Sequence, residues 1–111
     1  MTLNLPSDSD GDALRRLWQS GSDLTRPMTI DFAMSVPNEQ AGAAFAAAAT
    51  RLGYQADLDK DEPSGEWICY CSRRMVPSHT AILDAQRELN IAGRPFGAEA
   101  DGWGSFGNAG E

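Results

Sequence analysis

Residues 30–58 read IDFAMSVPNEQAGAAFAAAATRLGYQADL, and this stretch decides the fold. Its first seven positions alternate apolar with small or polar residues, with the apolar set at Ile30, Phe32, Met34 and Val36. That period predicts a strand with one buried face. After Pro37, the alanine-rich run over residues 40–52 places its larger apolar side chains on one stripe and predicts a helix. Alternation resumes over residues 54–58 and predicts a second strand.

A hairpin and a second helix follow this unit. Residues 60–65 form a polar loop containing Pro and Gly, which is typical of a hairpin, and residues 66–73 supply its second strand. Both faces of that strand are fairly apolar, so its inward face stays open. Ser78 is a good N-cap for a helix reaching about Asn90, and a last strand is predicted over residues 98–101.

A short amphipathic helix precedes all of these elements. It starts near Asp10 and ends at Ser20-Gly21-Ser22. The whole order predicts an α+β fold, a ferredoxin-like βαββαβ sandwich with a four-stranded antiparallel sheet and an extra N-terminal helix. Both long helices should share one face of the sheet, and the expected core includes Ile30, Phe32, Phe45, Leu52, Ile82 and Leu89. The other face must be covered by the N-terminal helix, by a partner or by solvent.

The length of 111 residues fits one domain, which we expect over residues 10–106. We expect residues 1–9 and 107–111 to be flexible ends. The start has no basic, apolar signal pattern, and no stretch of the sequence has the roughly 20 apolar residues of a membrane helix. Cys69 and Cys71 are the two cysteines, and their spacing along one strand is poor for a mutual disulfide. A reducing cytoplasm fits these features best.

The charge balance bears on the class of partner. Nine basic residues against 16 acidic ones give a net charge of -7. Such a chain repels the phosphate backbone that supplies most non-specific nucleic-acid affinity, so direct RNA or DNA binding is not expected. The same charge attracts cationic partners, although it equally suits a protein that is merely kept soluble.

No catalytic group or cofactor is predicted. His79 is the single histidine, and no hydrolase motif accompanies it. Cys69, Cys71 and His79 together offer three soft ligands, whereas a structural zinc site usually has four. Small buried hydrophobes on a strand are the favoured interpretation of the cysteines, and we expect no bound metal.

Two features could bind a protein partner. The hairpin and its flanks carry a cluster of carboxylates at Asp57, Asp59, Asp61, Glu62 and Glu66. This cluster is either a solvated loop or a docking patch for an arginine-rich segment. Trp103, in a glycine-rich ending, either folds back onto the sheet or serves as an aromatic anchor, and the same holds for Phe106.

Four short segments resemble a known family. They are Leu52-Gly53-Tyr54, Trp67-Ile68-Cys69-Tyr70-Cys71, Met75-Val76-Pro77-Ser78-His79 and Asp101-Gly102-Trp103-Gly104-Ser105-Phe106. The sequence from about Asp10 to Phe106 is similar to the ribonuclease E inhibitor RraB family. The resemblance implies the ferredoxin-like fold, and a regulator that binds RNase E, chiefly its arginine-rich non-catalytic scaffold, and lowers RNA turnover without touching RNA. The alternatives are a protein-interaction or dimerisation module of unknown target, and a small-molecule or metal-binding domain using Cys69, Cys71 and His79.

Overall fold

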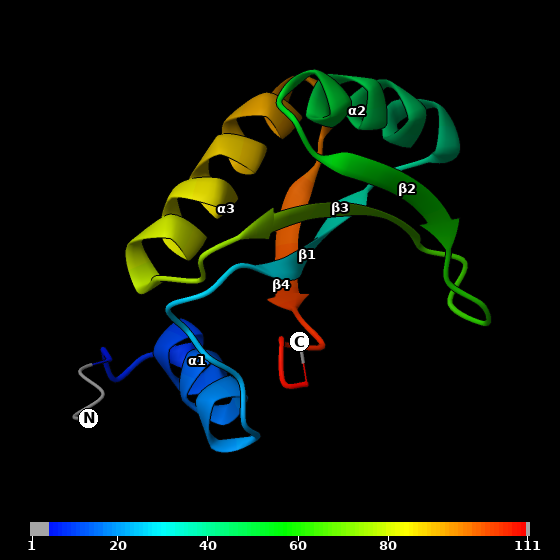
Figure 1. Ribbon diagram of the computed structural model, residues 1–111. Helices are drawn as coiled ribbons and strands as arrows, with labels where there is room; N and C mark the ends of the chain where they lie inside the picture. The colour runs from blue at the N-terminus through cyan, green and yellow to red at the C-terminus, as the bar shows by residue number, and fades with distance from the viewer. Residues whose placement is uncertain (1–4, 111) are drawn as a thin grey trace.

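The structure is a computed structural model that describes residues 5–110 (Figure 1). Within them lie three α-helices, a short 3₁₀ helix and four strands. In chain order these are α1 Ser9–Gln19, β1 Met28–Val36, α2 Glu39–Arg51, β2 Gln55–Lys60, β3 Trp67–Met75, α3 His79–Gly93, η1 Arg94–Phe96 and β4 Glu99–Gly104. The predicted order of elements is confirmed. The last strand runs to Gly104, beyond the predicted residues 98–101, and α3 continues past Asn90.

The strands form one sheet in the order β2-β3-β1-β4, and all neighbouring strands are antiparallel. The predicted α+β class and four-stranded antiparallel sheet are confirmed, and the strand order is consistent with the ferredoxin-like arrangement. Phe32 in β1 lies opposite Cys71 in β3 and opposite Trp103 in β4. Because directly opposed residues of an antiparallel pair share a face, these three side chains point to the same side of the sheet.

That side of the sheet carries the core. Alternate residues of β1 are buried, as the sequence pattern predicts: Met28, Ile30, Phe32, Met34 and Val36. Cys69 and Cys71 are buried beside them, which decides the inward face of β3 that the sequence left open. Figure 1 shows α2 and α3 together on this side of the sheet, and these helices contribute Phe45, Ile82 and Leu89.

The close packing of α2 depends on a glycine. A Cβ atom at Gly42 would lie 2.5 Å from Leu58 Cδ1 and 3.0 Å from Val36 Cγ2. The missing side chain therefore lets the helix backbone approach β1 and β2. Asn38 caps the start of α2 by accepting a hydrogen bond from the Ala41 amide, and Ser78 does the same for α3 with Ala81.

One predicted core residue is wrong. Leu52 is 39% exposed, because α2 ends at Arg51 and Leu52 is its C-cap. The helical stripe that points Phe45 and Ala49 into the core does not extend to a residue at the helix end. Leu52 instead contributes apolar surface beside α3.

Helix α1 lies with the other helices rather than across the opposite face of the sheet. Its Leu14 is buried in the core, it contacts α3, and its Asp10 accepts a hydrogen bond from Trp103, whose side chain lies on the core side. Within residues 5–110, the second face of the sheet is therefore left uncovered by helices.

The two chain ends bear on the predicted domain limits. Residues 1–4 of the expected flexible N-terminus lie outside the described residues, whereas Asp8 forms the N-cap of α1. In the expected C-terminal tail, Asn108 is buried, and its amide group hydrogen-bonds backbone groups of Asp23, Arg26 and Pro27.

Candidate functional site

The uncovered face of the sheet consists of the side chains that alternate with the core residues. We call the part of it toward the β2–β3 hairpin the open face and define it by Asp31, Ala33, Ser35, Asp57, Asp59, Ile68, Tyr70, Ser72 and Glu99. Four of these nine residues are carboxylates, and they come from three strands. The same side of the sheet continues at its other end with Gln55, Thr29 and Arg74.

The strand register arranges the open face in rows across the sheet. One row runs Asp59, Ile68, Ser35 and Glu99, and the next runs Asp57, Tyr70 and Ala33. Adjacent strands lie about 4.8 Å apart and alternate residues of a strand about 7 Å apart. The carboxylates of Asp57 and Asp59 therefore flank the side chains of Tyr70 and Ile68 on one side. A third row contains Ser72, whose hydroxyl donates to Asp31, and Arg74 lies beyond it opposite Thr29.

An apolar centre lies between these charges. Tyr70 is 39% exposed, and Ile68 beside it is half-buried. An exposed aromatic ring flanked by a carboxylate suits an arginine side chain, because the guanidinium group can stack on the ring while it pairs with the acid.

The predicted hairpin residues continue from this face. Asp57 and Asp59 belong to β2, whereas Asp61, Glu62 and Glu66 are exposed residues of the loop beyond it. The Asp61 carboxylate accepts a 2.6 Å hydrogen bond from the Ser64 hydroxyl. The backbone amide of Asp61 donates to the backbone carbonyl of Glu66 at 2.7 Å. Asp61 thus orders the turn.

Glu62 lies near a basic group. Its carboxylate is 3.8 Å from the ammonium group of Lys60, which itself lies over the Trp67 ring. This exposed pair offsets part of the negative charge at the loop tip. Asp57 and Asp59 in β2 instead lie on the open face.

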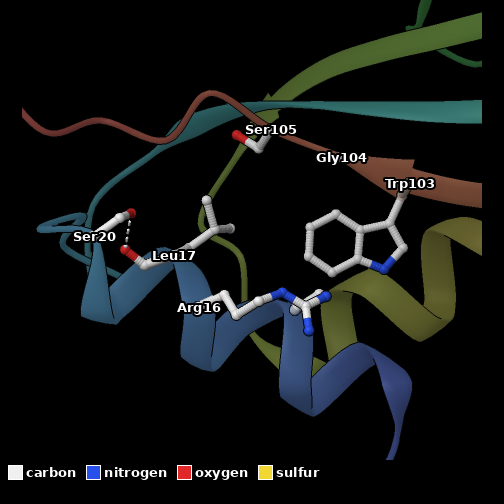
Figure 2. A pocket seen from close by; sticks show the side chains of 7 residues that line it. Arg16, Leu17, Ser20, Trp103, Gly104 and Ser105 are labelled. Atoms are coloured by element: carbon white, nitrogen blue, oxygen red, sulfur yellow. Dashed lines mark hydrogen bonds between the residues drawn. The ribbon is translucent and has the colours of Figure 1, made fainter.

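Trp103 lies on the core side of the sheet and not with the acidic hairpin. Figure 2 shows its ring pointing from β4 toward the helix that carries Arg16 and Leu17. It lines a hollow of about 300 Å³ together with Ser105 and residues of α1. Its indole nitrogen donates to Asp10 at 2.7 Å. The structure thus folds Trp103 back, whereas the side chain of Phe106 is fully exposed.

Cys69, Cys71 and His79 do not form one site. The cysteines are buried on the core side of β3, and a hydrogen bond between the two thiols together with burial raises the pKa of Cys71. His79 is at the start of α3, where its Nε2 atom is 2.9 Å from Asp8 Oδ2. The Gly11 amide and His79 hold the pKa of Asp8 below its usual value.

Asp8, Asp10 and His79 bring three ligand-type atoms within 4.8 Å of one another. Each of these residues already has a partner within the protein, since Asp8 caps α1 and contacts His79, while Asp10 accepts from Trp103. We therefore interpret this cluster as a set of structural hydrogen bonds that join α1, α3 and β4.

The residues that the sequence did not single out are Asp31, Ile68, Tyr70 and Glu99. The alternation of β1 already marked Asp31 as outward-facing. The placement of Ile68 and Tyr70 depends on which face of β3 points inward, and a strand with two apolar faces does not reveal this. The placement of Glu99 depends on the register of β4.

Comparisons with known proteins identify the family of the chain. No curated protein matches the chain in sequence. Across residues 5–110, none of the helices has the length and apolar character needed to span a membrane. The family model RraB, described as regulator of ribonuclease activity B, matches residues 7–105, which include every element of the sheet and α1–α3. The chain therefore belongs to the RraB family, the regulators of ribonuclease activity B.

Proposed function

We propose that this chain binds an RNase E-type endoribonuclease and lowers its cleavage of RNA, without catalysis of its own. Membership in a family of ribonuclease regulators supports this function. The observation that carries the proposal is the open face, where four carboxylates and an exposed tyrosine, with Asp57 directly beside it, share a side of the sheet that no described helix covers.

The partner segment that fits this surface is extended and rich in arginine. Alternate residues of an extended peptide are spaced by the same distance of about 7 Å as Asp57 and Asp59 on β2. Arginine side chains at such positions would pair with these acids, and one of them would stack on Tyr70. A disordered scaffold segment of the nuclease has the freedom to adopt this shape.

The acidic hairpin extends the proposed surface. Asp61, Glu62 and Glu66 lie beyond the end of β2, where they add to the negative field that an approaching basic segment meets. Exposed charges of this kind mainly raise association rates. For Trp103, we propose a separate contact at the hollow beside α1, on the other side of the sheet.

The same surface disfavours RNA itself. Carboxylates on the open face would meet the phosphates of a nucleic acid laid across the sheet, and like charges repel. Regulation would therefore act through the nuclease, and we place it in the cytoplasm on the sequence features given above.

A reconstituted cleavage assay tests this function. The purified RNase E of the source organism is given a fluorescent RNA substrate with increasing amounts of the chain. We expect the cleavage rate to fall and saturate at the concentrations at which the two proteins bind. An unchanged rate with excess chain, together with no binding in a pulldown, would show that this nuclease is not the target.

A further inference from the structure

Strand β2 forms one border of the sheet, with β3 as its single neighbouring strand among residues 5–110 (Figure 1). Across the hairpin, the Asp61 amide donates to the Glu66 carbonyl at 2.7 Å, in the same register as β2 and β3. Hydrogen-bonded pairs alternate with non-hydrogen-bonded pairs along an antiparallel ladder. The backbone groups of Asp57 and Asp59 therefore bond to β3, and those of the residues between and beside them point outward.

The outward amides and carbonyls belong to Ala56 and Leu58. No described residue pairs with them, because β2 is the last strand on this side of the sheet. The register of β2 against β3 is regular over all six of its residues. A regular strand with unpaired backbone groups is a template on which another strand can form.

The opposite border of the sheet does not offer such a template. There, the Ala100 amide of β4 donates to the side chain of Asn90 at 3.0 Å. The register of β4 against β1 also shifts between Phe32 and Met34. A side chain and an irregular register thus blunt the edge of β4, whereas the edge of β2 stays open.

The charges of β2 select the occupant of this edge. A residue opposite Asp57 or Asp59 in an added antiparallel strand would form a non-hydrogen-bonded pair, with Cα atoms about 4.5 Å apart and adjacent side chains. Arginine at both positions would make charge-assisted hydrogen bonds to the two carboxylates. A second copy of β2 centred on Leu58 would instead set Asp57 against Asp59, and opposed like charges destabilise a strand pair.

The position between the two acids calls for an apolar residue. Leu58 points to the helix side of the sheet, where it packs against α2 at Gly42. It stays half-buried, so part of its side chain is accessible at the edge. An apolar residue opposite Leu58 would cover that part, while its own amide and carbonyl bond to the outward groups of Leu58.

We propose that the basic segment of the partner adds to the sheet as a fifth strand, antiparallel to β2. Its pattern is arginine, apolar residue, arginine, with the arginines opposite Asp59 and Asp57 and the apolar residue opposite Leu58. The arginine opposite Asp57 continues the row of the open face that leads to Tyr70. This inference rests on the proposed function, in which the nuclease supplies a basic segment, and it states how that segment is held.

NMR titration of the isotope-labelled full chain with a synthetic peptide tests the proposal. The probe is the acetylated and amidated peptide Val-Arg-Val-Arg-Val. We expect the amide signals of Ala56 and Leu58 to shift and these amides to exchange with solvent more slowly, because each gains a hydrogen bond to the peptide. Unchanged exchange of these amides at saturating peptide would overturn the proposal, as would no binding at millimolar peptide.

Two N-methylated peptides of equal charge and composition test the strand pairing. N-methylation of the central valine removes the N–H that would bond to Leu58 and puts a methyl group against β2, so affinity should fall at least about tenfold. N-methylation of the second arginine is the matched control. Its N–H points to solvent in the antiparallel arrangement, and affinity should change by less than about threefold. Equal affinities, or a larger loss in the arginine-methylated peptide, would overturn the antiparallel fifth strand.

The same experiment separates this inference from the proposed function. If the chain inhibits the nuclease but the peptide does not protect the edge of β2, the added strand alone is wrong. If the peptide protects the edge with the expected N-methylation pattern and the nuclease is unaffected, the edge site stands and the proposed target is wrong.

Discussion

The indole nitrogen of Trp103 donates a 2.7 Å hydrogen bond to the carboxylate of Asp10, and this bond joins the last strand to the first helix. The two residues are 93 positions apart in the sequence. Gln86 of α3 also lies within 3.4 Å of the same carboxylate oxygen. Asp10 therefore connects α1, α3 and β4, and it helps to keep α1 off the open face.

Replacing Trp103 with Phe should remove this hydrogen bond while keeping most of the apolar contact. We expect a loss of about 1 kcal/mol in the free energy of unfolding, the usual net contribution of one hydrogen bond. Chemical denaturation followed by circular dichroism measures it. Trp18→Phe is the matched control. Because Trp18 is 42% exposed, its replacement should change the free energy of unfolding by less than about 0.5 kcal/mol. Equal effects of the two substitutions would mean that the bond to Asp10 contributes nothing.

Most of the fold follows from local sequence patterns. The period of β1 and the caps at Asn38 and Ser78 depend on neighbouring residues alone, and they predict the elements correctly. Leu52 was misplaced because its burial depends on where α2 ends. The position of α1 could not be predicted, since it is fixed by the contact between Asp10 and Trp103, which are far apart in sequence.

The candidate site was predicted in part. A run of acidic residues was visible around the hairpin, but the sequence does not separate Asp57 and Asp59, on the open face, from Asp61, which orders the turn. Tyr70 could not be assigned to a face because the residues on both sides of its strand are apolar. The register with β1 decides it.

The pairing of Asp8 with the Gly11 amide and with His79 makes stability depend on pH. A carboxyl group whose pKa is lowered in the folded state stabilises that state above its unfolded pKa, near 3.8, and loses this contribution as the pH falls through its folded pKa. Asp8→Asn should therefore lower stability at neutral pH, although Asn still caps a helix. The difference from wild type should shrink below about pH 4, as both side chains become neutral.

Thermal unfolding of wild type and Asp8→Asn from neutral to acidic pH provides the measurement. His79→Gln keeps the bond to the Gly11 amide, the larger cause of the lowered pKa, and should give an intermediate effect. A constant difference in stability across the whole pH range would show that the Asp8 charge does not stabilise the fold.

Tyr70 should contribute to partner binding through its ring. Tyr70→Ala removes the surface on which a guanidinium group would stack, and we expect affinity for the nuclease to fall by about three- to tenfold, the range for an exposed cation–π contact of about 1 kcal/mol. Tyr70→Phe keeps the ring and should bind nearly as wild type does. Isothermal titration calorimetry distinguishes these outcomes. If both variants bind equally well, the partner does not stack on Tyr70.

The central claim is that the carboxylates of the open face hold a basic segment of the nuclease. The most direct measurement is the affinity of the chain for the nuclease from about 0.01 M to 1 M salt, over which the Debye length falls from about 30 Å to 3 Å. The open-face variant is the double substitution Asp57→Asn and Asp59→Asn. The control variant is the double substitution Asp12→Asn and Glu39→Gln, which also removes two charges, from the first turns of α1 and α2. Both are compared with wild type. We predict that the open-face variant binds about three- to tenfold more weakly at low salt with a flatter salt dependence, whereas the control follows wild type. Identical affinity and salt dependence of the open-face variant and wild type would contradict the account.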